Sequence, residues 1–201
     1  MKAGKNMKIV GITGGTGTGK TTVLNYLKTL DAHVIDCDAV YHRLLKENKQ
    51  LLADLEAAFG GVVKDGELDR KALGAVVFSD EKALQQLNEI THHYISEDVE
   101  SQLERERAAG RNICAIDAIG LLEGGLKDRC DFTVGIVAPT ELRVSRLMAR
   151  EGITEEYARL RIDAQKPNEY FIENCDYTLE NSNNNLSEFN EKCAALFAGL
   201  L

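Results

Sequence analysis

The residues with the clearest chemical potential lie in the stretch GGTGTGKTT, Gly14–Thr22. The stretch fits the pattern G-x-x-x-x-G-K-[ST] in full, with Gly14 at its first position and Lys20-Thr21 at its last. Glycines let backbone N–H groups curl round a phosphate, and the N-terminus of a following helix adds partial positive charge. Lys20 then reaches the β- and γ-phosphates, while the Thr21 hydroxyl can hold Mg²⁺. The stretch therefore predicts a nucleoside triphosphate site rather than a glycine-rich helix cap.

This loop is shared by kinases, GTPases and motor ATPases, so other residues must separate these classes. Asp117-Ala118-Ile119-Gly120 imitates the Asp-x-x-Gly with which a GTPase senses γ-phosphate. A guanine-binding protein also needs Asn-Lys-x-Asp, and the chain's one Asn-Lys pair, Asn48-Lys49, is followed by Gln50-Leu51. The pattern disfavours a nucleotide-binding switch, which stays the alternative outside catalysis.

Two acids follow the second expected strand, in Asp36-Cys37-Asp38. Two residues apart at a strand end, both carboxylates point to the same side, and ligands bind at the carboxyl ends of parallel strands. One carboxylate can accept the proton of an attacking hydroxyl while its partner binds the water shell of Mg²⁺. The competing interpretation is a pair of acids that cap the next helix. A phosphate-binding loop on an adjacent strand favours the functional pair.

Three arginines share one face of an expected helix, at Arg143, Arg146 and Arg150. The spacing i, i+3, i+7 places them together, and guanidinium is a planar, permanently charged donor suited to phosphate. In a chain of net charge −8, something must neutralise a transferring phosphoryl group. We therefore favour Arg146 and Arg150 as phosphate ligands, beside an expected lid at Gly152–Gln165, over a merely solvated helix face.

The long connection after the second strand carries Arg70, His92 and His93. Adjacent histidines on a helix point about 100° apart, so a shared metal ion is not expected. A structural role is the simpler interpretation for each of them. One histidine facing a substrate is the functional alternative.

Strand and helix signals alternate along the chain. Short β-branched runs predict five strands, at Lys8–Thr13, Ala32–Asp38, Asn112–Asp117, Asp131–Ala138 and Asp176–Leu179. Apolar residues at helical spacing predict a helix over Lys20–Leu30, and Pro139 and Gly152 mark the start and the end of a later one. This alternation predicts a parallel sheet covered on both faces. The connection Ala39–Arg111 is too long for a simple crossover and indicates a helical insertion.

Composition bounds the class of protein. Hydrophobic residues make up 44% and charged residues 28% of the 201 residues, the balance of an ordinary soluble protein. The net charge of −8 and the pI near 5.1 argue against nucleic acid or an anionic membrane as partner. Five scattered cysteines without Cys-x-x-Cys predict reduced thiols and a cytoplasmic protein. No signal peptide or membrane span is expected, and residues 1–6 are expected to be a disordered leader before Met7.

Several motifs together resemble dephospho-CoA kinases, in their order and spacing from about Lys8 to Asn181. They are GITGGTGTGKTT, HVIDCDAVYHRLL, LDRKALGAVVFSDEKALQQLNEITHHYI, DAIGLLEGGL, RLMAREGITEEYARLRIDAQ and LEN. The most specific parts are the Asp-x-Asp after the second strand, Leu68-x-Arg70, the Leu-Asn-x-Ile-x-His of Leu87–His92, and Arg146-x-x-x-Arg150 with Gln165.

The resemblance implies an α/β, three-layer P-loop NTPase fold, similar to nucleoside monophosphate kinases. Its parts would be a five-stranded parallel sheet, a helical insertion that binds the acceptor and a short lid. The chain would be a single kinase domain over residues 1–201, with a core of about 7–38, 112–150 and 170–201, the insertion at about 39–111 and the lid at about 151–168. The family transfers the γ-phosphate of ATP to the ribose 3′-hydroxyl of dephospho-CoA, which completes coenzyme A. ATP with Mg²⁺ and dephospho-CoA are thus the expected ligands of a monomer or weak homo-oligomer.

The resemblance also assigns roles by position. Nucleotide ligands are implied at Gly15, Gly17, Thr18, Gly19, Lys20, Thr21, Thr22 and Arg150. Asp38 would act as base toward the 3′-hydroxyl, with Lys20 and Arg146 at the transferring phosphate. Acceptor ligands are implied at Asp38, Arg70, His92, Asp117 and Glu123, and metal ligands at Thr21 and Asp36.

Two segments depart from the family's pattern. His92-His93 stands where the family has His-Pro, and Asp117–Glu123 keeps both acids of an Asp-x-Pro-Leu-Leu-aromatic-Glu segment without its proline. Both segments belong to the implied acceptor site. A kinase of another small metabolite is therefore the alternative among enzymes.

Overall fold

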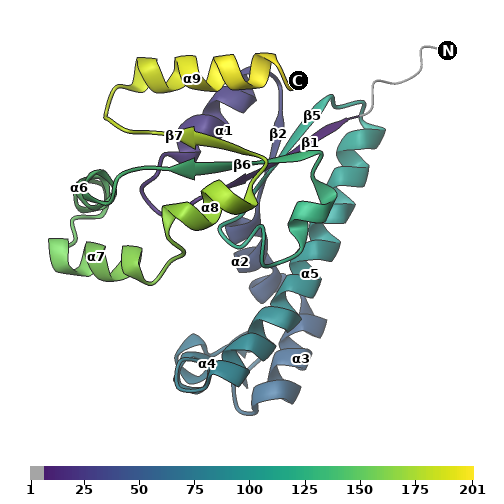
Figure 1. Cartoon of the computed structure of the whole chain (residues 1–201). Helices are drawn as coiled ribbons and strands as arrows, with labels where there is room; N and C mark the ends of the chain where they lie inside the picture. Colours follow the sequence, from purple (N-terminus) through teal and green to yellow (C-terminus); the bar gives the residue numbers. More distant parts are fainter. Residues whose placement is uncertain (1–6) are drawn as a thin grey trace. The chain divides into compact units, whose positions relative to one another are not determined.

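The computed structural model describes residues 7–201, so the leader expected at residues 1–6 lies outside the described part. The chain divides into two compact units (Figure 1). The core unit comprises the residues up to Val34 and those from Glu106 onward, and the helical unit comprises Ile35–Arg105. The single kinase domain with an insertion at about 39–111 stays a prediction, beside a helical unit that spans Ile35–Arg105.

The core unit is built on a five-stranded sheet with the strand order β2-β5-β1-β6-β7. The strands are β1 (Lys8–Thr13), β2 (His33–Asp36), β5 (Ile113–Asp117), β6 (Phe132–Val137) and β7 (Tyr177–Glu180). β1 pairs in parallel with β5 and β6, and β6 pairs in parallel with β7. The α/β class and the five-stranded parallel sheet are confirmed.

Helices of the core unit lie on both faces of this sheet (Figure 1). They are α1 (Lys20–Thr29), α6 (Thr140–Glu151), α7 (Glu155–Asp163), α8 (Asn168–Asn174) and α9 (Leu186–Ala198), with a 3₁₀ turn η1 (Leu126–Arg129). Val134 and Ile136 of β6 belong to the apolar cluster that also contains buried residues of α1 and α9. Gly135 faces the other way, where a Cβ would lie 3.1 Å from Phe171 of α8. Alternation along β6 thus separates the two covered faces.

α6 and α7 form a helical hairpin with its own apolar cluster, made of Val144, Leu147, Ala158 and Ile162. Pro139 precedes α6, and Gly152 ends it in the left-handed conformation, at φ 66. Thr154 then caps α7 by accepting from a backbone N–H. The start and the end predicted for the first of these helices are confirmed, because proline and glycine fix the backbone there.

The helical unit contains four helices and a two-stranded antiparallel hairpin. The elements are α2 (Cys37–Glu47), α3 (Lys49–Phe59), β3 (Val63–Lys64), β4 (Glu67–Leu68), α4 (Arg70–Val77) and α5 (Glu81–Ala108). The last residues of α5 belong to the core unit.

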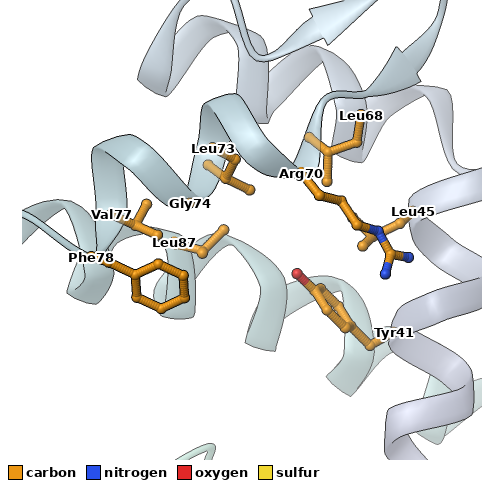
Figure 2. A pocket seen from close by; sticks show the side chains of 9 residues that line it. All are labelled: Tyr41, Leu45, Leu68, Arg70, Leu73, Gly74, Val77, Phe78 and Leu87. Atoms are coloured by element: carbon orange, nitrogen blue, oxygen red, sulfur yellow. The ribbon is translucent and has the colours of Figure 1, made fainter.

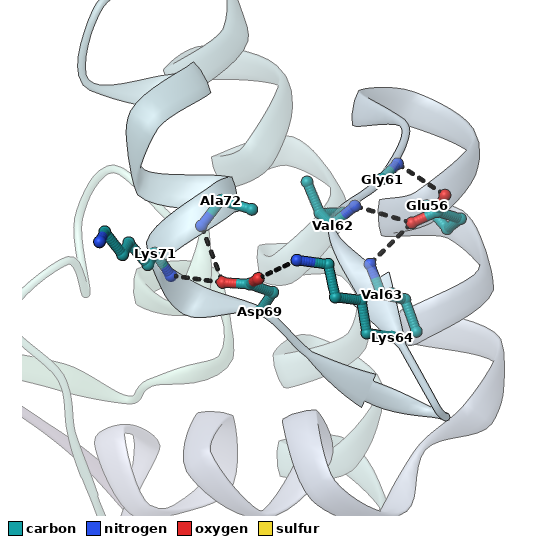
Figure 3. Close-up of polar contacts among 8 residues, drawn as sticks. All are labelled: Glu56, Gly61, Val62, Val63, Lys64, Asp69, Lys71 and Ala72. Atoms are coloured by element: carbon teal, nitrogen blue, oxygen red, sulfur yellow. Dashed lines mark hydrogen bonds and ion pairs between the residues drawn. The ribbon is translucent and has the colours of Figure 1, made fainter.

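Two carboxylates organise the connection between α3 and α4 (Figure 3). Glu56 accepts from three successive backbone N–H groups after α3, which lowers the pKa of its carboxyl group. Asp69 caps α4 by accepting from Lys71 and Ala72, and it also pairs with Lys64 at 2.7 Å. These contacts fix where α4 begins, and hence place Arg70 as its first residue.

The end of β2 differs from its prediction. β2 ends at Asp36, and α2 begins at Cys37, so Asp38 lies in the first helical turn rather than on a strand. The expectation that both carboxylates project from one strand end is wrong. Asp36 accepts from the N–H of Ala39 at 2.9 Å and so starts the helix two residues earlier than predicted.

Candidate functional site

The glycine-rich loop between β1 and α1 has all its carbonyls engaged. Six consecutive carbonyl oxygens, from Gly14 to Gly19, each accept a hydrogen bond of 2.8 to 3.1 Å. In chain order the donors are Lys20 Nζ, Thr18 Oγ1, Arg143 Nε, Arg146 Nη1, Asn181 Nδ2 and Thr22 N. With its carbonyls held, and the Thr16 N–H donated to Gln165 at 2.8 Å, the loop keeps the amide groups of Gly17, Thr18 and Gly19 for another acceptor.

The amide groups of the same loop are suited to an anion. Within residues 7–201, the N–H groups of Gly17, Thr18 and Gly19 donate to no protein acceptor. Gly19 is the N-cap of α1, in a left-handed conformation, without a side-chain cap or an acidic residue in the first turn. The N-termini of α2, α3, α4, α7 and α9 all have side-chain caps. Free amides at a helix N-terminus bind phosphate.

Two glycines of the loop are required by the side chains behind it. A Cβ on Gly15 would lie 2.3 Å from Nη2 of Arg143, and one on Gly19 would lie 2.3 Å from Nδ2 of Asn181. The glycine pattern therefore reflects close packing by donors from α6 and from the segment after β7, in addition to the approach of a phosphate.

Arg143 is a buried cation of the site, 3% exposed. Its Nε donates to the carbonyl of Thr16 at 2.9 Å, and its Nη2 donates to Oε1 of Gln165 at 3.0 Å. Burial lowers the pKa of Arg143, and the charge of Asp163 acts in the opposite direction. An arginine in this setting stays protonated, so the positive charge is retained next to the loop.

Arg146, one turn further along α6, directs all three guanidinium nitrogens at neutral oxygens. Nη1 donates to Gly17 O at 3.1 Å, and Nε donates to Asn184 Oδ1 at 3.1 Å. Nη2 donates to Asn181 Oδ1 at 3.1 Å and to Asn183 O at 2.6 Å. Arg146 thus joins the loop to the segment after β7. Its direct contact with a phosphate stays a prediction.

The remaining arginines of the α6–α7 hairpin are paired with carboxylates. The pairs are Arg150 and Arg161 with Glu151, and Arg159 with Glu141 and Glu155. Arg150, expected to bind nucleotide, is exposed in the last turn of α6, with its Nη2 2.5 Å from Glu151 Oε1. A role for Arg150 at the phosphates would require it to leave this partner.

Asp117 lies at the carboxyl edge of the sheet, beside the strand that leads into the loop. It ends β5 and stands in register with Ile12 of β1. The following residue, Ala118, donates to the carbonyl of Ile12 at 3.2 Å, and the hydroxyl of Thr13 donates to Ile119 O at 3.0 Å. The sheet therefore brings Asp117 to the edge from which the glycine-rich loop starts.

Glu123 lies further along the same segment. It neighbours Tyr170 of α8, whose pKa is raised by burial and by the charge of this carboxylate. The assignment of Glu123 to an acceptor stays a prediction.

Asp36 and Asp38 both belong to the helical unit. Asp36 is the N-cap of α2, as the competing capping interpretation predicts. Asp38 is exposed in the first turn of the same helix. Their roles as metal ligand and base stay predictions.

The helical unit contains a largely apolar pocket of about 160 Å³ (Figure 2). Its lining comes from α2, β4, α4 and α5 and consists of Tyr41, Leu45, Leu68, Arg70, Leu73, Gly74, Val77, Phe78 and Leu87. Arg70 and Tyr41 supply its polar groups, and Arg70 lies 3.3 Å from His42 Nδ1. The ring of Phe78 is 86% exposed at the other side. The pocket thus pairs an apolar wall with one cation.

Neither of the adjacent histidines lines this pocket. His93 is exposed and lies 3.4 Å from Glu97, one turn further along α5. His92 is half-buried on the same helix. Over residues 7–201, no group of three or more His, Cys, Asp or Glu side chains is arranged to hold a metal ion.

A magnesium ion that came with a bound phosphate would find an oxygen ligand at the start of α1. Mg²⁺ keeps several waters and binds through one or two protein oxygens together with substrate phosphates. Thr21, exposed in the first turn of α1, offers one such hydroxyl oxygen next to the free loop amides. A dedicated cage of carboxylates is not required for this mode of binding.

A family model described as dephospho-CoA kinase matches residues 8–187. The chain belongs to the dephospho-CoA kinase family. The dephospho-CoA kinase of Dehalococcoides mccartyi is 42% identical over 161 residues, which cover 79% of this chain and 81% of that protein. Members of this family are phosphotransferases that act on a hydroxyl group.

Solved structures share the fold of this chain. A crystal structure from Thermus thermophilus matches with a TM-score of 0.80 at 34% identity, and the match covers 98% of this chain and 100% of that one. The dephospho-CoA kinase from Campylobacter jejuni matches with a TM-score of 0.67 at 24% identity, over 96% of both chains. The second likeness supports the fold. In the part of the chain from Met7 onward, no helix has the length and apolar character needed to span a membrane.

Three residues of the site had no role assigned from the sequence. Gln165 and Asn181 appear in the family motifs, but only their hydrogen bonds to the loop reveal what they hold. Tyr41 also lies in one of the family motifs, HVIDCDAVYHRLL, but only the structure shows that it lines the pocket. The motif order thus gave a signal for all three residues, and none of their contacts.

Proposed function

We propose that this protein transfers the γ-phosphate of ATP to the ribose 3′-hydroxyl of dephospho-CoA, giving coenzyme A and ADP. The observation that carries the proposal is the glycine-rich loop, with six carbonyls held and three amides available, in a chain that matches the family over residues 8–187. The loop amides and Lys20 bind the β- and γ-phosphates, and the arginines behind the loop supply positive potential.

The chemical step exchanges one P–O bond for another. The acceptor oxygen bonds to the γ-phosphorus, the bond from that phosphorus to the bridging oxygen breaks, and ADP leaves with the electron pair. Asp38 accepts the proton of the acceptor hydroxyl. Its exposed carboxylate in the first turn of α2 supports this role, together with its position in the Asp-x-Asp motif.

The helical unit holds the acceptor. Its pocket of about 160 Å³ is too small for all of dephospho-CoA and suits a segment of the pantetheine arm against apolar side chains. Arg70 at the edge of the pocket suits the diphosphate. His92, Asp117 and Glu123 remain proposed acceptor ligands.

Mg²⁺ bound with ATP would neutralise charge on the β- and γ-phosphates, with Thr21 and Asp36 as its proposed ligands.

The five cysteines are free thiols, and three of them are buried. This supports a reducing, cytoplasmic setting for a monomer or weak homo-oligomer. The acidic net charge of −8 supports small-molecule ligands rather than nucleic acid or membrane.

The direct test is an ADP-release assay with dephospho-CoA, AMP and shikimate as acceptors and GTP as alternative donor. We expect ADP release with ATP and dephospho-CoA together, and only background with the other acceptors. Stronger release with another acceptor would identify a kinase of a different metabolite. Nucleotide hydrolysis that needs no acceptor would support the nucleotide-binding switch.

Asp38→Asn tests the base. We expect kcat to fall by roughly 10²–10⁴-fold with little change in ATP binding, because only proton removal is lost. A large loss of ATP affinity with kcat preserved would instead make Asp38 a metal ligand or a structural residue.

A further inference from the structure

We propose that Gln165 is a positioning residue for the nucleotide: its side-chain oxygen joins the Thr16 amide to the Arg143 guanidinium and so fixes the glycine-rich loop in its phosphate-binding form. The inference deepens the proposed function and rests on it only in taking ATP as the ligand of this loop. Gln165 does not itself touch the reacting atoms.

The geometry of this link is specific. Oε1 of Gln165 accepts from the Thr16 N–H at 2.8 Å and from Nη2 of Arg143 at 3.0 Å. A carbonyl oxygen has two lone pairs, so both are used. Nε of Arg143 closes the ring by donating to the carbonyl of Thr16 at 2.9 Å. One residue of the loop is thus held at both its N–H and its C=O.

The link also preserves a positive charge next to the loop. Arg143 is 3% exposed, and within residues 7–201 its hydrogen bonds and ion pairs include no carboxylate. A glutamine accepts from this guanidinium without neutralising it, as a glutamate would. Besides the charge of Asp163, which acts on Arg143 without a hydrogen bond, a bound triphosphate would supply counter-charge here.

Gln165 ties the loop to the α6–α7 hairpin. Its own N–H donates to the carbonyl of Ile162 at 3.1 Å, and Ile162 is buried in the cluster that joins α7 to α6. A change in the packing of α7 is therefore transmitted to Thr16 through one side chain. The loop conformation, and with it the affinity for ATP, depends on this contact.

The test is a double-mutant cycle on the dissociation constant for ATP, measured by titration calorimetry on the full chain without acceptor. Gln165→Met and Arg143→Met replace each side chain by an apolar one of similar length. We expect each single change to weaken ATP binding by about 10-fold, and the double change to cost clearly less than the product, because the two residues act as one unit. Gln86→Met, at an exposed glutamine of α5, is the matched control and should bind ATP like the unmodified protein.

Two further readouts separate positioning from general stability. In Gln165→Met, hydrogen exchange at the Thr16 amide should accelerate, and KM for ATP should rise while KM for dephospho-CoA stays within about twofold. Unchanged ATP affinity in Gln165→Met, or multiplicative effects in the cycle, would overturn the inference while leaving the proposed function intact. Failure of the unmodified chain to bind ATP would instead remove the proposed function.

Discussion

Five arginines of the core unit fall into two groups with opposite surroundings. Among residues 7–201, Arg143 and Arg146 hydrogen-bond only to carbonyl and amide oxygens, and both contact the glycine-rich loop. Arg150, Arg159 and Arg161, on the same helical hairpin, each lie against a carboxylate. All five come from the same two helices, so the difference lies in the partner and not in the element.

The two groups differ in whether their positive charge stays available to a ligand. A guanidinium bound by carbonyls satisfies its donors and still projects a full positive charge, whereas a carboxylate cancels that charge locally. Burial lowers the pKa of both Arg143 and Arg146, which reflects the energetic cost of removing a guanidinium charge from water. A bound triphosphate would offset that cost. Arg150, Arg159 and Arg161 carry no such cost, since their carboxylates and the solvent stabilise them.

The largest expected effect falls on the loop's own cation. Lys20 donates to the carbonyl of Gly14 at 2.8 Å, and in the proposed mechanism it meets the phosphates directly. We expect Lys20→Ala to abolish transfer in the ADP-release assay while the thermal unfolding midpoint stays close to that of the unmodified protein. Near-normal turnover would remove the loop from the mechanism.

Arg146→Ala should have the next largest effect. It removes a charge and also five hydrogen bonds from Arg146 to neutral oxygens of the loop and of the segment after β7. We expect kcat and kcat/KM to fall together by at least roughly 10²-fold, within the range known for arginines at phosphoryl-transfer sites. Arg146→Lys should recover only part of this loss, because one ammonium cannot replace the planar fork.

The control for this prediction is Arg107→Ala, at an exposed arginine near the end of α5. It should change kcat by less than twofold (about the effect of a typical surface charge). If Arg146→Ala also changed kcat by less than twofold, its hydrogen bonds to the loop carbonyls would not contribute to catalysis. The two groups of arginines would then not differ in their effect on kcat.

Local patterns predicted most of the core unit. The six residues of β6 are all buried, so that strand appears in the sequence as a continuous apolar run. Pro139 and Gly152 fix the ends of α6 through backbone geometry alone. The end of β2 was missed because one hydrogen bond, from Ala39 to Asp36, decides between strand and helix there.

The site was predictable only where its residues are neighbours in the chain. The loop motif is local and predicts a phosphate site by itself. The side chains that hold the loop are far away in sequence: Asn181 is 163 residues from its partner Thr18, and Arg143 is 127 residues from Thr16. Periodicity placed Arg143 in a cluster, but burial and partner decide its role, and both depend on packing.

Arg150→Ala tests an arginine that combines features of the two groups. Arg150 shares the helix face with Arg146 but is paired with Glu151, so any contact with nucleotide must compete with that ion pair. We expect Arg150→Ala to lower kcat/KM for ATP by about 10-fold, a smaller loss than for Arg146→Ala. The loss is smaller because Arg150 must break its ion pair with Glu151 before it contacts the nucleotide, which weakens its net contribution. A loss as large as that of Arg146→Ala would mean that the pair is given up at little cost.

Glu151→Gln tests the same pair from the other side. The pKa of Glu151 is lowered by Arg150 and then by Arg161, so the carboxylate is charged in the assay. Removing this charge should lower KM for ATP by about twofold if Arg150 then turns to the nucleotide. A higher KM would show that the ion pair itself supports the active arrangement of the hairpin.

The smallest effect is expected at Arg159, which has the strongest set of ion pairs in the hairpin. It lies 2.6 Å from Glu141 and 2.8 Å from Glu155, and these hydrogen bonds raise the pKa of its guanidinium. Ion pairs alone would therefore rank Arg159 above Arg146, which has none among residues 7–201. The pairs are exposed, however, and an exposed ion pair contributes little because water and salt screen it. We expect Arg159→Ala to change kcat and KM for ATP by less than about twofold, and raising the salt concentration should shrink even that difference. A loss comparable to that of Arg146→Ala would show that neutralised arginines of the hairpin act on the phosphates, and that the partner of an arginine does not predict its role in this fold.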